Sequence, residues 1–259
     1  MPDGPAARRV SSRSPRCMAW LALRARADRA LRGSFLLDGE KLAREAIACG
    51  MARALLVDER RTDQFQPLIY EAMGAGLEVF YLTGATLARL ADTPSPQGVI
   101  VEASLPAPAE PDGLGARVVA LDGAQDPGNV GAILRTADAA GVTGLLVSAS
   151  CADPYSMKAV RASMGSVFRV PVRVSGDAAG IVRGWKAAGR CIVMADARGE
   201  DYSSISVSEP WALVIGSEGR GVSPGMAALA DRIVSIPMRR PVESLNAAVA
   251  ASILIYALR

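Results

Sequence analysis

The amino-acid sequence predicts an α/β protein in two parts, and three features carry that prediction. Short apolar runs that fit buried strands alternate with stretches whose apolar residues recur at helical spacing. Residues 105–115, LPAPAEPDGLG, hold three prolines and two glycines without a hydrophobic period, which marks a linker. Beyond this linker the strands are mostly apolar, which is typical of a parallel sheet covered by helices on both faces.

Before the linker we expect a small α/β domain over residues 16–104. Its strands are predicted at residues 54–57, 79–82 and 98–101, and its helices at 16–32, 41–49, 66–73 and 85–91. Residues 1–15 are rich in arginine and serine, and we expect a disordered basic tail on a cytoplasmic protein. An organellar transit peptide is the alternative reading of such a segment.

After the linker we expect a larger domain over residues 116–259. Strands are predicted at residues 117–121, 144–148, 168–174, 191–195, 211–215 and 232–236, and helices at 131–140, 178–188 and 245–258. Proteins with parallel sheets bind ligands in the loops at the carboxyl ends of their strands. The loops that follow these strands are therefore where a functional site is expected.

Composition excludes several kinds of chemistry. The chain has 259 residues and no histidine, which rules out Ser-His-Asp, Cys-His and histidine–metal sites. The four cysteines, Cys17, Cys49, Cys151 and Cys191, lack metal-ligand spacing, so we expect no metal. The longest mostly apolar run, residues 247–258, is too short to span a bilayer, so no membrane association is expected. An enzyme of this composition must work with carboxylates, arginine, hydroxyls, backbone groups and a cofactor.

The first notable loop follows the strand predicted at residues 117–121. It contains Asn129, which could cap the next helix, then Gly131, and it leads to Arg135 inside that helix. A capped helix with a surface arginine is common, so this segment alone is weak evidence. Its glycine spacing does not match a dinucleotide-binding fingerprint, which argues against an oxidoreductase with a Rossmann-like sheet.

Two further loops follow later strands. Between residues 216 and 221 three glycines flank the single carboxylate of Glu218, and such a loop lets backbone amides approach a ligand closely. Ser244 and Asn246 stand directly before the last helix, and either could be a simple helix cap. A hydroxyl and an amide together exceed what capping requires.

Taken in order, these three loops resemble the motifs of the SpoU/TrmH family of RNA 2'-O-ribose methyltransferases. The resemblance covers about residues 117–259, and a softer one to the family's substrate-binding domain starts at residues 35–39, FLLDG. This chain departs from the usual pattern at Arg240, where many relatives have glycine, at Ala247, and at Ser14. The matching residues are Asn129, Gly131 and Arg135, then Ile215, Gly216, Glu218 and Gly219, and finally Ile236, Pro237, Met238, Ser244, Leu245 and Asn246.

The resemblance implies a fold and an activity. The second domain would be a parallel-sheet SPOUT domain with a C-terminal deep trefoil knot, paired as a homodimer through this catalytic domain. The protein would use S-adenosyl-L-methionine to methylate a ribose 2'-hydroxyl of structured RNA. We expect 23S (large-subunit) ribosomal RNA as the substrate. The alternatives are a transfer RNA 2'-O-methyltransferase and a non-catalytic RNA-binding relative.

The resemblance also implies roles for single residues. Arg135 would stabilise the developing alkoxide, with Asn129 and Asn246 orienting Arg135 or the ribose. Glu218 would hold the guanidinium or its own loop, and Ser244 would add a hydrogen bond. The residues expected to bind the cofactor are Gly216, Ile236, Leu245, Ile215 and Met238.

Arginines gather near the start of the chain. Eight lie between residues 8 and 32 against one acid, although the net charge is only +3. Such a cluster fits RNA phosphate binding, but it also fits a solvated tail or a general preference for arginine over lysine. The resemblance favours RNA contact, and the expected contacts are Arg16, Arg24, Arg26, Arg29 and Arg240.

Overall fold

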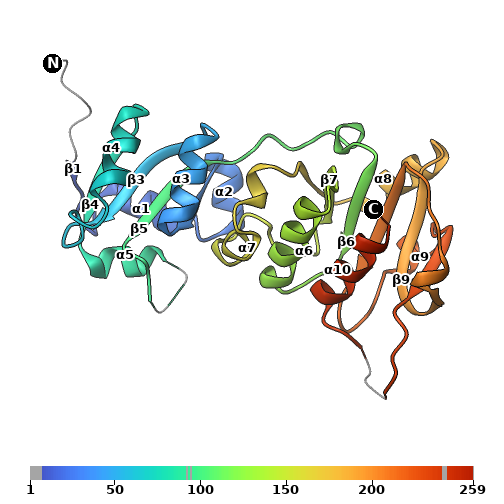
Figure 1. Cartoon of the computed structure of the whole chain (residues 1–259). Coiled ribbons are helices and arrows are strands. Elements are labelled where there is room, and N and C mark those ends of the chain that lie inside the picture. Colours follow the sequence, from blue (N-terminus) through green and yellow to red (C-terminus); the bar gives the residue numbers. More distant parts are fainter. Residues whose placement is uncertain (1–7, 92, 94, 241–243, 259) are drawn as a thin grey trace. The chain divides into compact units, whose positions relative to one another are not determined.

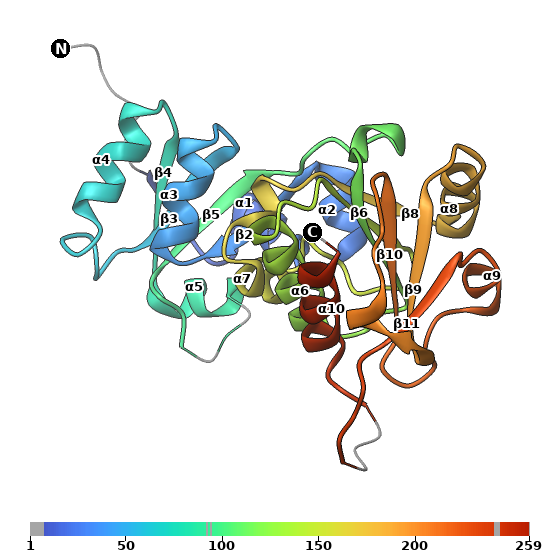
Figure 2. The same cartoon turned by 45° about the vertical axis from the view of Figure 1, so that its right-hand side comes forward.

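The structure, a computed structural model, describes residues 8–91, 93, 95–240 and 244–258. The chain forms two compact units (Figures 1 and 2). The first unit comprises Met1–Pro106 and Tyr155–Phe168, and the second comprises Ala107–Pro154 and Arg169–Arg259. Over the described residues no helix is long and apolar enough to cross a membrane.

A five-stranded mixed sheet forms the centre of the first unit. Its strands lie in the order β1 (Arg8–Arg9), β4 (Glu78–Leu82), β3 (Ala52–Asp58), β5 (Val99–Ser104) and β2 (Ser34–Asp38). Strand β5 is antiparallel to both of its neighbours, and the other pairs are parallel. Because Arg8 and Arg9 pair with Phe80 and Tyr81, the disorder expected for residues 1–15 is wrong for residues 8–15. Residues 1–7 lie outside the described residues.

The helix expected over residues 16–32 is two helices. The first ends at Ala22, and the second ends at Arg32 and is capped by Gly33, whose φ of 59° is left-handed and favours glycine. One guanidinium nitrogen of Arg29 donates to the carbonyls of Leu23 and Arg24 at the break, which satisfies acceptors that a continuous helix would have bonded internally. The helices before the linker are α1 (Pro15–Ala22), α2 (Arg26–Arg32), α3 (Glu40–Ala48), α4 (Gln66–Gly74) and α5 (Gly84–Leu90).

A further helix of the first unit, α7 (Met157–Ser163), comes from far along the chain and was not predicted. The Phe35 ring on β2 lies 5.5 Å from the ring of Tyr155 and 6.3 Å from that of Phe168. These contacts bury Phe35 completely. Residues 155–168, expected within the domain spanning 116–259, therefore pack with the first unit.

The second unit has the parallel sheet that the sequence predicts. Its six strands, all parallel, lie in the order β11 (Arg232–Ser235), β9 (Cys191–Asp201), β10 (Trp211–Gly216), β6 (Arg117–Asp122), β7 (Gly144–Ser148) and β8 (Val172–Ser175). The strand expected from residue 168 begins only at Val172, because Ser166–Phe168 form a 3-10 turn that packs with the first unit.

Helices cover this sheet on both faces. Helices α8 (Ala178–Ala187) and α9 (Pro224–Ala227) share a core with the sheet, while α6 (Pro127–Ala139) packs against α10 (Ala247–Ala257). Strands β6 and β10 are neighbours, in register from Trp211 opposite Arg117 to Gly216 opposite Asp122. Their following loops consequently leave the same edge of the sheet side by side, where parallel α/β proteins bind ligands.

Candidate active site

Side chains that follow three of the strands meet at this edge of the sheet. The Asn129 side-chain amide donates to the Glu218 carboxylate, and Asn246 Nδ2 donates to Asn129 Oδ1 at 3.0 Å. These residues follow β6, β10 and β11 respectively. Three of the five residues expected to be catalytic are therefore linked in one hydrogen-bonded chain, hereafter the Asn–Glu–Asn cluster.

The local structure explains why Asn129 is available for this contact. The expectation that Asn129 caps its helix is wrong, because α6 begins at Pro127 and Asp126 is the cap, accepting from the Gly128 amide at 2.6 Å. Asn246 does cap α10, since its Oδ1 accepts from the Ala248 amide at 2.9 Å. Its Nδ2 remains for Asn129, so one side-chain amide serves both the helix and the cluster.

The two helices point their amino ends at the cluster. Besides the Asn129–Asn246 bond, Thr136 and Ser252 hydrogen-bond at 2.9 Å farther along, so α6 and α10 run parallel. Helix amino ends carry partial positive charge, which stabilises a nearby carboxylate. The amino ends of both helices therefore lie beside the Glu218 carboxylate through the Asn129 side chain.

Arg135 lies on α6, six residues beyond Asn129, and its side chain is exposed. The described part of the chain offers its guanidinium no hydrogen bond or ion pair. Of the two roles expected for Glu218, holding the guanidinium or holding its own loop, the first is not seen among the described residues, because the Glu218 carboxylate accepts from the Asn129 amide. Asn129 and Asn246 also bond to each other rather than to Arg135. The guanidinium thus remains available to a ligand.

The glycine-rich loop after β10 folds back tightly on itself. Ser217 and Gly221 exchange two backbone hydrogen bonds, each of 3.0 Å. A Cβ atom at Gly216 would lie 2.2 Å from the backbone carbon of Gly221 and 2.4 Å from the backbone nitrogen of Val222. Only glycine fits at residue 216 without moving this backbone. At Gly219, by contrast, a Cβ would meet nothing within 4 Å.

A cavity of about 370 Å³ opens beside the loop after β11. Three residues expected to bind the cofactor line it, namely Ile236, Met238 and Leu245. Ser244, expected to be catalytic, also lines it and is exposed. Gly216 and the buried Ile215 are not among its lining residues.

Asp196 lines the same cavity and was missed in the sequence. It is the first polar residue after the apolar run at 191–195, so the rule that singled out the other loops would have found it. Both carboxylate oxygens accept from the Arg198 guanidinium, at 2.9 and 3.0 Å. Those hydrogen bonds hold the pKa of Asp196 below its usual value.

A second cavity, of about 710 Å³, lies between the loops after β6 and β10, and Glu218 lines it. Gln125, which was not predicted as a site residue either, lines this cavity. Its side-chain amide donates to the carbonyls of Ser150 at 2.6 Å and Gly123 at 3.2 Å. Among the described residues no group of three or more Cys, Asp or Glu could hold a metal ion. The residues at this edge therefore offer hydrogen-bonding groups, guanidinium groups and carboxylates.

The arginines expected to contact RNA differ in exposure. Arg16, Arg24 and Arg26 are exposed near or on α1 and α2, and Arg240 is exposed in the loop after β11. Arg29 is only 5% exposed and bonds to the carbonyls at the helix break. The structure does not support Arg29 as an RNA contact, because its guanidinium is committed to the fold.

Comparison with known proteins identifies relatives of both parts of the chain. A model of the SpoU rRNA methylase family matches residues 116–256, and one of the MRM3-like substrate binding domain matches residues 14–101. The chain is 32% identical over 252 residues to the 23S rRNA (guanosine(2553)-2'-O)-methyltransferase RlmP of Bacillus subtilis, covering 96% of this chain and 98% of that protein. It is 35% identical over 268 residues to the 23S rRNA (uridine(2479)-2'-O)-methyltransferase of Streptomyces viridochromogenes, covering 97% and 92%.

Solved structures agree with these relatives over nearly the whole chain. The AdoMet-bound rRNA methyltransferase from Sinorhizobium meliloti superimposes with a TM-score of 0.82 at 30% identity, covering 96% of each chain. The SpoU methyltransferase AviRb from Streptomyces viridochromogenes, in complex with AdoMet, gives a TM-score of 0.82 at 32% identity, covering 95% of this chain and 97% of that one. The resemblance seen in the sequence is confirmed for both domains.

Proposed function

Because the chain belongs to the SpoU rRNA methylase family, we propose that it methylates a ribose 2'-hydroxyl of 23S ribosomal RNA, using S-adenosylmethionine. The observation that carries this proposal is the Asn–Glu–Asn cluster, built from residues that follow three parallel strands, with Arg135 on the same helix as Asn129 and unpaired among the described residues. Both curated relatives named above are 23S rRNA 2'-O-methyltransferases that match over more than nine-tenths of each chain. We place the protein in the cytoplasm.

The cavity beside the loop after β11 fits the cofactor. Its volume of about 370 Å³ lies within the usual range of small-molecule sites, and its wall combines apolar and polar groups. Ile236, Met238 and Leu245 would enclose the adenosine, while Ser244 and Asp196 face the same space. Ile215 and Gly216 would act indirectly, by fixing the shape of the neighbouring loop. When bound, S-adenosylmethionine supplies a methyl group on a positively charged sulfur, which is an activated leaving group.

The chain's own residues then have to position and activate the 2'-hydroxyl. Arg135 almost never loses its proton, so it acts as a fixed positive charge that stabilises the alkoxide developing on the ribose oxygen. A phosphate of the RNA accepts the hydroxyl proton. Asn129 and Asn246 orient the ribose, and Glu218 fixes the side-chain conformation of Asn129. Ser244 adds a hydrogen bond at the cofactor cavity.

We further propose that the loops after β10 and β11 and helix α10 form a deep trefoil knot, and that two copies pair through the second unit. Helix α10 supports the pairing, because Val249 and Tyr256 lie two turns apart on it and are 48% and 42% exposed. Apolar side chains that remain exposed on one helix face favour a protein partner. Sedimentation equilibrium should give twice the chain mass of 26.9 kDa.

The first unit, with residues 16–104 at its centre, is proposed to bind the RNA. Its match to a substrate-binding domain model and its exposed Arg16, Arg24 and Arg26 support this role. Arg240 is proposed as a further RNA contact from the second unit. Among the described residues, neither the three arginines of the first unit nor Arg240 lines the proposed cofactor cavity.

The test is methyl transfer from labelled S-adenosylmethionine to total bacterial RNA, followed by alkaline digestion. Alkali cannot cut beside a 2'-O-methyl ribose, so label should appear in alkali-resistant dinucleotides from 23S RNA. Arg135→Ala should lower the rate on the order of a hundredfold or more. Arg183→Ala, an exposed arginine on α8, is the matched control and should retain the rate.

The other outcomes discriminate among the alternatives. Label found only in transfer RNA would show that transfer RNA, and not 23S ribosomal RNA, is the substrate. Cofactor binding without transfer to free RNA or to ribosomal assembly intermediates would indicate a non-catalytic RNA-binding protein. Failure to bind the cofactor would contradict the proposed function.

A further inference from the structure

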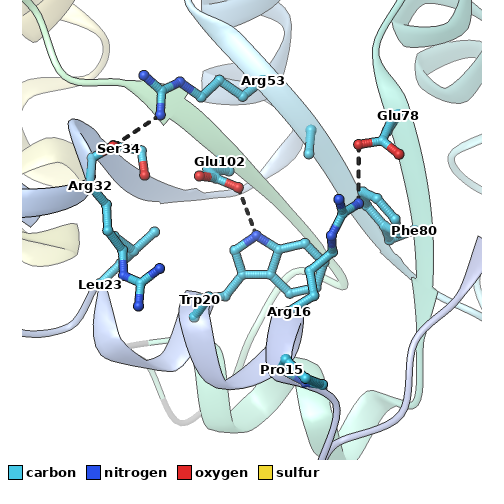
Figure 3. A pocket seen from close by; sticks show the side chains of 12 residues that line it. Pro15, Arg16, Trp20, Leu23, Arg32, Ser34, Arg53, Glu78, Phe80 and Glu102 are labelled. Atoms are coloured by element: carbon cyan, nitrogen blue, oxygen red, sulfur yellow. Dashed lines mark hydrogen bonds and ion pairs between the residues drawn. The ribbon is translucent and has the colours of Figure 1, made fainter. Parts of the chain in front are cut away.

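The first unit contains a cavity of about 630 Å³ that the methyl-transfer reaction does not use (Figure 3). It lies between helix α1 and one face of the mixed sheet, and β2, β3, β4 and β5 all contribute to its wall. Trp20, Leu23 and Phe80 form its apolar part, and the Trp20 and Phe80 rings pack edge to face with centroids 5.3 Å apart. Its volume fits a small organic ligand.

Two polar groups in this cavity have unused hydrogen-bonding capacity. Glu102 Oε2 accepts from the Trp20 indole Nε1 at 2.7 Å, while its other carboxylate oxygen has no partner among the described residues. Ser34 is 1% exposed, and its hydroxyl has no hydrogen-bond partner within the described part of the chain. Leu36 pairs with Glu102 across the sheet, so Ser34 lies diagonally opposite Glu102 on the same face. A buried hydroxyl without a partner is uncommon and unfavourable, which indicates that a ligand completes this site.

Arginines surround the opening. The Arg16 guanidinium lies 4.5 Å above the Phe80 ring and pairs with Glu78 at 3.1 Å. Arg53 donates from Nε to Ser104 Oγ at 2.9 Å and from Nη1 to the Arg32 carbonyl at 3.2 Å. The Arg32 guanidinium itself has no partner in the described part of the chain. Three guanidinium groups against two carboxylates favour an anionic ligand, and a nucleotide phosphate meets that requirement.

The carboxylate restricts which base can enter. An ionised carboxylate only accepts hydrogen bonds, and guanine presents two adjacent N–H donors, N1–H and N2–H, on its Watson–Crick edge. Adenine and cytosine place an acceptor beside their donor, and uracil has a single N–H donor. Proteins that recognise unpaired RNA bases hold them against aromatic or guanidinium planes and bond to their Watson–Crick edges. Glu102 with the surrounding arginines offers this combination.

We propose that this cavity binds one unpaired guanine of the RNA substrate. Glu102 accepts from the guanine N–H groups, Ser34 completes the hydrogen bonding, and Arg32 and Arg53 neutralise the adjoining phosphate. That the guanine belongs to an RNA substrate rests on the proposed function, whereas the chemistry of the cavity does not. The site would place the substrate through a nucleotide distinct from the one that is methylated.

Nuclear magnetic resonance of the full chain tests this directly. The protein has three tryptophans, so it gives three indole N–H signals, and a Trp20→Phe spectrum identifies that of Trp20. Guanosine 5'-monophosphate should shift the Trp20 signal saturably and leave those of Trp185 and Trp211 in place. Adenosine 5'-monophosphate should bind at least about tenfold more weakly, as expected when a paired hydrogen bond to a base is lost. The proposal would be overturned if both nucleotides shifted the Trp20 signal equally or if inorganic phosphate alone shifted it. Absence of any shift with guanosine 5'-monophosphate would overturn it as well.

Glu102→Gln provides the second arm. Glutamine can still accept from the Trp20 indole, so the fold is retained, but one of the two acceptors for guanine is lost. Preference for the guanine nucleotide should disappear, and KM for RNA should rise about tenfold or more while kcat stays unchanged. Glu59→Gln removes the same charge outside the cavity and should change neither value. Unchanged guanine binding in Glu102→Gln would contradict the assignment.

The two proposals fail separately. A Trp20 shift with guanosine monophosphate in a protein that methylates no RNA would leave the cavity assigned and the proposed function wrong. Methylation of RNA without any shift of the Trp20 signal would support the proposed function and contradict the assignment of the cavity.

Discussion

The side-chain amide of Asn246 donates to the side-chain oxygen of Asn129, 117 residues earlier in the chain, at 3.0 Å. The same Asn246 side chain accepts from the first backbone amides of α10. Asn246 therefore both caps helix α10 and belongs to the Asn–Glu–Asn cluster. Substitutions at residue 246 can separate its contribution to the stability of the helix from its contribution to the cluster.

Asn246→Asp should keep the cap and lose the donor to Asn129. We expect thermal stability close to wild type, because aspartate caps helices as well as asparagine does. Methyl transfer should fall about tenfold or more, since the Asn129 side chain loses its restraint and a second carboxylate comes near Glu218. Asn246→Ala should show the same loss of activity and also lose about 1 kcal/mol of stability. Full activity of Asn246→Asp in a methyl-transfer assay would show that the link is not used.

Two glycines in the loop after β10 form a matched pair for substitution. Gly216→Ala should distort the loop, because its Cβ would overlap the backbone of Gly221 and Val222. We expect weaker S-adenosylmethionine binding, measured by calorimetry, and a lower Tm. Gly219→Ala has open space and should leave both unchanged. Equal effects from the two variants would mean that loop flexibility, rather than close backbone approach, is what matters.

Arg29 and Arg26 lie on the same short helix but should behave differently. Arg29→Ala removes the donor to the Leu23 and Arg24 carbonyls, and we expect a loss of about 1–3 kcal/mol in the free energy of unfolding. Arg26→Ala should leave the Tm unchanged and reduce the salt dependence of RNA binding, because one phosphate contact is lost. Thermal unfolding and RNA titrations at several salt concentrations check both. A stable Arg29→Ala protein with weakened RNA binding would restore Arg29 as an RNA contact.

The pH dependence of stability should depend in part on Asp231. The Lys186 ammonium, 2.8 Å away, and the Ile192 amide hold the pKa of this carboxyl below its usual value. A depressed folded-state pKa gives stability that is present above the unfolded pKa and is lost as pH falls through the folded one. Tm should therefore fall below about pH 4. The Tm of the Asp231→Asn variant should fall less steeply with decreasing pH over that range. The same dependence of Tm on pH in the variant and the wild type would contradict the assignment.

The strands of the second unit were predictable because burial on both faces leaves an unbroken apolar run, as at Gly144–Ser148. The two-residue strand Arg8–Arg9 carries no such signal, because it exists only through pairing with β4. Helix α7 was missed, and the distant packing of its segment with the first unit cannot be read from local periodicity. The start of α6 was available in principle, since Asp126 before Pro127 is a strong helix-start pattern.

The candidate site was predictable as a set of residues and less so as a set of contacts. The motifs named Asn129, Glu218 and Asn246, and the structure joins them. The sequence left Glu218 either the Arg135 guanidinium or its own loop as a partner, and only the distances in the structure single out the Asn129 amide. Arg29 was misassigned for a similar reason. A charged residue in a basic cluster gives no sign that its guanidinium closes a break between two helices.

The chain passes from one unit to the other after Pro106, after Pro154 and after Phe168. A protease that cuts the proline-rich linker would therefore divide the first unit, because residues 155–168 belong to it and would stay on the carboxyl-terminal fragment. A fragment ending at Pro106 would also lack Tyr155 and Phe168, and would uncover the Phe35 ring that they bury. The first unit is consequently not a module that recombination could move by a single cut on each side.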